Sequence, residues 1–82
     1  MPVIDVNLWS SLRRFAGGEE IVSVEAETVA GMINALKKAY PDLAPALDAG
    51  VSVSVNGEIT NNRFAPLEEG SEVFLLQPLK GG

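Results

Sequence analysis

The chain has 82 residues, enough for one domain with a thin core but not for a deep substrate cavity, so a self-contained enzyme is disfavoured. It contains neither cysteine nor histidine, which excludes disulfides, thiolate metal sites and the commonest general base near neutral pH. The net charge of −5 disfavours nucleic acid as a partner, and no apolar run reaches the length of a membrane span. We therefore expect a cytoplasmic protein that binds no metal, no membrane and no nucleic acid.

The N-terminal part of the chain predicts a strand, a helical turn and a second strand. Apolar and polar residues alternate over 3–8, which is the two-residue period of a half-buried strand. A helical turn is expected over 10–16 and is ended by Gly17-Gly18, and a second short strand is expected over 21–24. The two strands are predicted to pair as an antiparallel hairpin with a wide loop.

The middle of the chain predicts the one long helix, over 28–40. Thr28 is a good N-cap residue, and Pro41 stops the helix because it lacks a backbone N–H and its ring clashes with the preceding turn. The apolar residues of this segment fall on one helical stripe: Val29, Met32, Ile33, Leu36 and Tyr40. A shorter helical piece is expected over 42–49. The long helix would cover one face of a small sheet.

The C-terminal part predicts a hairpin, a loop and a final strand. Valine and serine alternate over 51–55, and Asn56-Gly57 is a strong hairpin signal because both residues accept a positive φ. A short return strand is expected over 58–60, followed by a loop over 61–70.

The final strand, over 72–77, is apolar on both of its faces. Such a strand is either covered on both sides or presents one face to a partner. If Val73 and Leu75 face the helix, strand geometry turns Phe74 and Leu76 outward.

These elements predict an α+β roll. The order is strand, strand, helix, strand, strand, strand, and the first and last strands can pair in parallel through the crossover that contains the helix. The expected fold is a mixed sheet of four to five strands with one main helix across one face. We predict a folded domain over 1–77 and a flexible tail over 78–82.

This order, the chain length and the ending Gly81-Gly82 together resemble the β-grasp (ubiquitin-like) sulfur carrier family. The family includes the small subunit of molybdopterin synthase and the thiamin-pathway sulfur carrier. The most specific part of the resemblance is 69–82, an acidic turn, an apolar strand, a proline and a terminal diglycine. The segment 55–58, Val-Asn-Gly-Glu, also matches, and the resemblance covers essentially the whole chain.

The resemblance implies a chemistry for the C-terminus. Gly82 would be adenylated by a ubiquitin-activating-enzyme-like adenylyltransferase that uses ATP, and a sulfur donor would displace AMP to leave a thiocarboxylate. A sulfur-accepting synthase would then take the sulfur. The residues before Gly82 would form a tail that enters these enzymes: Pro78, Leu79, Lys80 and Gly81. The resemblance thus implies a protein co-substrate rather than an enzyme, with no bound cofactor, and a monomer when free.

The resemblance also implies that Phe74 and Leu76 dock the enzyme partners, because the family uses an outward apolar patch beside the tail. Packing of both residues under a loop or in a self-dimer is the alternative. Glu68, Glu69 and Glu72 form an acidic cluster, which is either a solvated loop face or a surface that docks basic residues.

Two further residues have open roles. Lys80 departs from the small residue that many family members carry, and it either contacts a carboxylate or phosphate of the partner or is solvated. Trp9 lies off the core face of the first strand by its parity, so it either packs against Phe15 or adds to a surface patch.

Other functions share parts of this pattern. A protein modifier conjugated to lysines through Gly82 needs the same activation, whereas a non-conjugating β-grasp interaction module does not need a free glycine end. An acyl carrier protein needs an attachment serine, which the Asp-Leu-Ala at 42–44 does not offer. Molybdopterin, cysteine, thiamin and tRNA thiolation remain open as pathways, with Pro78 nearer the molybdopterin type.

Overall fold

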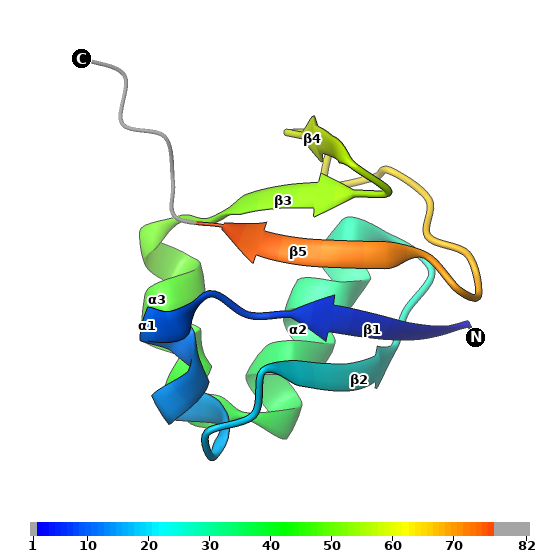
Figure 1. Ribbon diagram of the computed structural model, residues 1–82. Coiled ribbons are helices and arrows are strands. Elements are labelled where there is room, and N and C mark those ends of the chain that lie inside the picture. The colour runs from blue at the N-terminus through cyan, green and yellow to red at the C-terminus, as the bar shows by residue number, and fades with distance from the viewer. Residues whose placement is uncertain (1, 77–82) are drawn as a thin grey trace.

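In the computed structural model, which describes residues 2–76, one mixed sheet carries helices against one of its faces (Figure 1). Over these residues the strands are β1 (Val3–Asn7), β2 (Ile21–Glu25), β3 (Ser52–Val55), β4 (Glu58–Thr60) and β5 (Glu72–Leu76). The α-helices are α1 (Ser10–Arg13), α2 (Val29–Ala39) and α3 (Ala44–Ala49). Two 3₁₀ helices, η1 (Arg14–Ala16) and η2 (Pro41–Leu43), complete the described elements.

The strand order in the sheet is β2-β1-β5-β3-β4. The first and last strands of the chain, β1 and β5, are parallel neighbours, and the other neighbouring pairs are antiparallel. A parallel pair requires a crossover, and the chain makes one through α2, which packs across the sheet (Figure 1). The predicted α+β roll with a mixed sheet and one main helix is therefore confirmed.

The core lies between the sheet and the helices. β1 and β5 turn alternate side chains inward, so their burial patterns alternate along each strand. The side chains buried most completely come from both layers: Ile4, Leu12, Met32, Leu36, Leu43, Leu75, Val6 and Val73. Since the helices cover only one face, apolar side chains such as Ile21, Phe74 and Ile59 on the other face stay exposed.

The N-terminus of α2 is held by its own cap and by the loop over 61–70. The Thr28 hydroxyl oxygen accepts a hydrogen bond from the Gly31 backbone N–H at 3.1 Å. The backbone N–H groups of Val29 and Ala30 donate to carbonyl oxygens in that loop, at 3.1 and 2.8 Å. The first N–H groups of a helix have no partner within the helix, so these bonds satisfy them. Thr28 is the N-cap, as predicted.

Replacing Thr28 by Ala is expected to destabilise the fold by about 1 kcal/mol, because the substitution removes the acceptor for the Gly31 N–H. The midpoint of thermal unfolding should fall by about 4–8 °C for a domain of this size. Circular dichroism during heating measures this shift. Thr28→Ser keeps the hydroxyl and should retain most of the stability, so equal losses in both variants would contradict the capping role.

The turn between β3 and β4 fixes the start of β5. Asn56 and Gly57 adopt φ angles of 51° and 88°, which are the positive values that the sequence predicts for this hairpin. The Asn56 backbone N–H donates to the Glu72 carbonyl oxygen at 2.8 Å, and the Glu72 N–H donates to Asn56 Oδ1 at 2.9 Å. This reciprocal pair ties the hairpin turn to the first residue of the last strand.

The described elements differ from the expected ones mainly at their ends. The long helix stops at Ala39, one residue earlier than expected, and Pro41 begins η2 because its fixed φ suits a first helical position. The piece expected over 42–49 is therefore split into η2 and α3. Met1 and residues 77–82 lie outside the described residues, so the boundary between the domain over 1–77 and the tail over 78–82 stays a prediction.

Candidate functional site

The last strand, β5, is apolar on both faces, and the two faces have different environments. Val73 and Leu75 are buried in the core, at 0% and 1% exposure. Phe74 is 38% exposed, and Leu76 is half-buried. The predicted orientation of these four side chains is confirmed. The docking role of Phe74 and Leu76 stays a prediction.

Phe74 belongs to a row of side chains that runs across the whole sheet. The strand registers place Ile21, Asn7, Phe74, Ser54 and Ile59 side by side, one from each described strand. The three large apolar members are exposed, Ile21 at 51%, Phe74 at 38% and Ile59 at 56%. The face that no helix covers therefore carries three exposed apolar side chains in one row, separated by Asn7 and by Ser54, which is 8% exposed.

A groove of about 220 Å³ lies at the C-terminal end of β5. Phe74 and Leu76 line it together with Trp9 and Arg13. Trp9 is half-buried and packs against the core, and it also lines this groove; its contact with Phe15 stays a prediction. Leu76 is the last described residue and stands two positions before Pro78, where the predicted tail begins, so this groove lies at the end of the described chain nearest that tail in sequence.

The Arg13 side chain in this groove makes two contacts with neighbouring residues. The Arg13 Nε–H donates to the Leu8 carbonyl oxygen at 3.1 Å. The same guanidinium lies 3.8 Å from the Glu20 carboxylate. These two contacts orient the Arg13 side chain along one wall of the groove.

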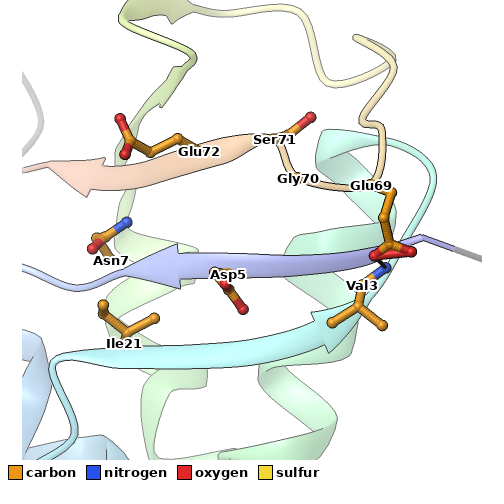
Figure 2. Close-up of a pocket in the computed structure, with 8 residues that line it drawn as sticks. All are labelled: Val3, Asp5, Asn7, Ile21, Glu69, Gly70, Ser71 and Glu72. Atoms are coloured by element: carbon orange, nitrogen blue, oxygen red, sulfur yellow. Dashed lines mark hydrogen bonds between the residues drawn. The ribbon is translucent and has the colours of Figure 1, made fainter.

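A second groove, of about 440 Å³, lies on the same face toward the other end of β5 (Figure 2). Three carboxylates line it, those of Asp5, Glu69 and Glu72. The Val3 backbone N–H donates to Glu69 Oε2 at 3.0 Å, which draws this loop carboxylate over the start of β1 (Figure 2). The acidic cluster predicted from Glu68, Glu69 and Glu72 is thus joined by Asp5 across the sheet, while Glu68 does not line this groove.

The residues predicted to carry the chemistry lie outside the described residues: Pro78, Leu79, Lys80, Gly81 and Gly82. Of the predicted site residues, the structure describes the two that are predicted to dock partners, Phe74 and Leu76. Their shared strand, β5, ends two positions before Pro78. The predicted reactive end and the predicted docking patch are therefore close together in the sequence.

Sequence reasoning missed three exposed apolar residues. Ile21 precedes a buried valine, so its strand parity could have been read from the alternation over 21–25. Ile59 is the single large apolar residue of the short strand β4, so no alternation of apolar and polar residues indicates which way it faces. Phe64 is 82% exposed in the loop over 61–70, where composition alone gives no orientation.

Neither a metal site nor a membrane-spanning helix is found among residues 2–76. No three side chains of the metal-ligating types that occur there lie close enough to hold a metal ion. Within the same range, no helix has both the length and the apolar character needed to cross a bilayer.

Comparison with protein families assigns the chain. The model of the ThiS family matches residues 6–82, which include the outward face of β5 and the terminal diglycine. The chain belongs to the ThiS family. The resemblance to β-grasp sulfur carriers that the sequence indicated is thereby confirmed. No curated protein sequence matches the chain.

Solved structures show that this ThiS-family chain shares its fold with several small proteins. SAMP1 from Haloferax volcanii has 28% sequence identity and a TM-score of 0.80, covering 98% of this chain and 99% of that one. CysO in the Amycolatopsis orientalis BexX/CysO complex has 23% identity and a TM-score of 0.81, covering 96% and 99%. The complex of molybdopterin-converting factor subunits 1 and 2 from Helicobacter pylori contains a match of 21% identity and TM-score 0.70, covering 98% and 99%.

Proposed function

We propose that this ThiS-family protein carries sulfur as a thiocarboxylate on Gly82. The observation that carries the proposal is the family match, which extends through the diglycine at residues 81–82. The protein acts as a co-substrate and not as a catalyst, and it binds no cofactor of its own. ATP is used by the activating partner.

The chemistry follows from the poor reactivity of a carboxylate toward a sulfur nucleophile. A carboxylate oxygen of Gly82 attacks the α-phosphorus of ATP, and pyrophosphate leaves. Hydrosulfide, or an equivalent sulfur nucleophile, then adds to the acyl carbon of the adenylate. The bond from that carbon to the AMP oxygen breaks, AMP leaves with the electron pair, and the thiol proton is lost to solvent. The product is a thiocarboxylate that a second enzyme uses as a sulfur donor.

The outward face of β5 supports this scheme, because it offers a surface on which partner enzymes could dock. The adenylating enzyme and the sulfur-accepting enzyme must each bind the domain while the C-terminus reacts in their active sites. Phe74 and Leu76 lie on the uncovered sheet face and line the groove beside the start of the segment 77–82. The solved complexes of CysO with BexX and of the two molybdopterin-converting factor subunits are pairs in which a protein of this fold binds a partner chain.

The test is the intact mass after activation. The purified protein is incubated with ATP, a sulfide source and each ATP-dependent adenylating enzyme encoded in the same genome. We expect one of these enzymes to release pyrophosphate and to raise the mass by the exchange of one oxygen for one sulfur. An unchanged mass with every such enzyme would refute the carrier proposal.

A second function is favoured by one comparison. SAMP1 is the match with 28% identity, and its name stands for a small archaeal modifier protein. The proposal here is that Gly82 is also joined to lysine amines of other proteins after the same adenylation. When a tagged form of the protein is expressed in its source organism, covalent adducts of higher mass should then appear and should survive denaturation. The same adducts should be absent when Gly82 is deleted.

A further inference from the structure

The strand β2 lies at an edge of the sheet, with β1 as its one neighbour among the described strands (Figure 1). In an antiparallel pair, alternate residues of a strand direct their backbone N–H and C=O groups toward the partner strand, and the residues between them direct theirs away. Two bonds at the ends of the β1–β2 pairing show which residues bond to β1. The Leu8 N–H donates to the Glu20 carbonyl oxygen at 2.9 Å, and the Ala26 N–H donates to the Pro2 carbonyl oxygen at 3.1 Å. The even-numbered residues of β2 therefore bond to β1.

The odd-numbered residues of β2 direct their backbone groups away from the sheet. These residues are Ile21, Ser23 and Glu25, and all three are exposed. Together they offer three N–H donors and three C=O acceptors in one row about 14 Å long. Within residues 2–76, no strand pairs with this row.

This edge lacks most of the features by which natural sheets prevent pairing with another chain. Such features are charged side chains, lysine above all, together with proline, β-bulges and very short edge strands. β2 has five residues without proline or lysine, its register with β1 is continuous, and its one charged residue, Glu25, is at its end. The other edge strand, β4, has only three residues. β2 is therefore the edge that can accept an added strand.

The row on β2 is complementary to itself, which is what an interface between two copies about a two-fold axis requires. An antiparallel second copy with Ser23 on the axis places Ile21 opposite Glu25 of that copy. All the outward backbone groups of both strands are then paired, and no like charges lie opposite each other within the strand pair. The Ser23 hydroxyl donates to Asp5 Oδ1 at 2.7 Å, so the residue on the axis is small, uncharged and already bonded within its own domain.

We propose that β2 pairs with β2 of a second copy of this chain, so that the two sheets become one continuous sheet. This inference does not rest on the carrier proposal. A strand pair about 17 Å long is a small interface, since stable complexes bury about 800 Å² of each partner. The dimer is therefore weak: the chain is a monomer at low concentration, as the family resemblance implies, and it pairs at high concentration. Pairing at the edge of the sheet leaves the outer face, with Phe74, accessible.

Charge just outside the strand opposes this pairing. In the same register, Glu19 lies opposite Glu27 of the second copy, beyond the ends of the two strands, and each copy carries a net charge of −5. Salt screens repulsion between exposed charges. Association should therefore strengthen as the salt concentration rises, whereas an interface between opposite charges weakens.

The pairing is tested by sedimentation equilibrium of the purified protein at high salt. From micromolar to millimolar concentration, the weight-average mass should rise from that of one chain toward that of two. Amide hydrogen exchange, measured by NMR over the same range, should slow at Ile21, Ser23 and Glu25 because their N–H groups become bonded. Val22 and Val24, whose N–H groups bond to β1, should be protected at every concentration.

Three variants test the register. Ile21→Glu places a carboxylate opposite Glu25 of the second copy, twice in each dimer, and should raise the dissociation constant about tenfold. Ile21→Glu combined with Glu25→Lys places opposite charges there and should return the constant to within about threefold of the wild type. Ile59→Glu is the matched control on the edge strand β4, with the same added charge, and should change the constant by less than about twofold at high salt. Both isoleucines are exposed, at 51% and 56%, so neither substitution opens the core.

A wild-type protein that keeps the mass of one chain up to millimolar concentration would overturn the proposal. Equal weakening by Ile21→Glu and Ile59→Glu would also overturn it, because the effect would then be one of net charge. A double variant that associates no better than Ile21→Glu alone would exclude the register with Ser23 on the axis, and with it this interface.

Discussion

Deletion of Gly82 is expected to reduce adenylation more than a hundredfold while leaving the midpoint of thermal unfolding within about 1 °C. Removing one residue shortens the reach of an extended chain by about 3.3–3.6 Å. A displacement of about 1 Å from the reactive geometry already lowers a rate on the order of a hundredfold. A terminal glycine has no side chain to bury, so its loss should have little effect on stability. Pyrophosphate exchange and calorimetry measure the two quantities.

Gly82→Ala is the matched control for chain length. It keeps the reactive carboxyl at its position in the chain but places a methyl group beside it, where close backbone approach to a nucleotide favours glycine. We expect this variant to be adenylated at an intermediate rate. The deletion variant still ends in a glycine carboxylate, that of Gly81, so normal adenylation of this variant would show that the reaction does not require the carboxyl to lie at position 82. A large drop in its stability would instead show that residue 82 belongs to the folded body.

The elements of the fold could be predicted from the sequence because each has its own period or boundary residue. The alternation over 3–8 gives β1, the apolar stripe behind Thr28 gives α2, and Asn56-Gly57 gives the hairpin. These patterns are local, and each depends on neighbouring residues alone. Exact helix ends were less predictable because Pro41 both ends α2 and begins η2.

The proposed docking face could be predicted only in part. The apolar run through β5 indicated that Phe74 and Leu76 face outward, since two faces of one strand cannot both enter a core covered by helices on one side. The rest depends on register between strands that are far apart in the chain. The row that joins Phe74 to Ile21 and Ile59 exists only because β5 lies between β1 and β3.

The groove lined by Asp5, Glu69 and Glu72 could not be predicted either, because it too depends on the register between distant strands. Asp5 and Glu72 come from opposite ends of the chain and meet through the parallel pairing of β1 with β5. The sequence gives the glutamates near the last strand but contains no local pattern that adds Asp5 to them. The register between β1 and β5, which is set by the fold, places Asp5 beside Glu72 in one groove and two residues from the Asn7–Phe74 pair.

Replacing Phe74 by Ala is expected to weaken binding of the adenylating enzyme by about 10- to 100-fold. Aromatic residues near the centre of an interface commonly contribute about 2 kcal/mol or more, which corresponds to a change in Kd in this range. Because Phe74 is already 38% exposed, its truncation should disturb the core little. Leu76→Asp should weaken binding further, since it places a charge in the groove beside the tail. Titration calorimetry measures Kd.

Two variants separate docking from folding. Phe64→Ala removes the same type of side chain from the loop over 61–70, where it is 82% exposed, and should change neither binding nor stability. Leu75→Ala changes the inward neighbour of Phe74, which is 1% exposed, and should lower stability by about 2–5 kcal/mol. If Phe74→Ala behaves like Leu75→Ala, Phe74 is a core residue. If it behaves like Phe64→Ala, the enzyme binds elsewhere, because a partner seated on this sheet face must bury Phe74.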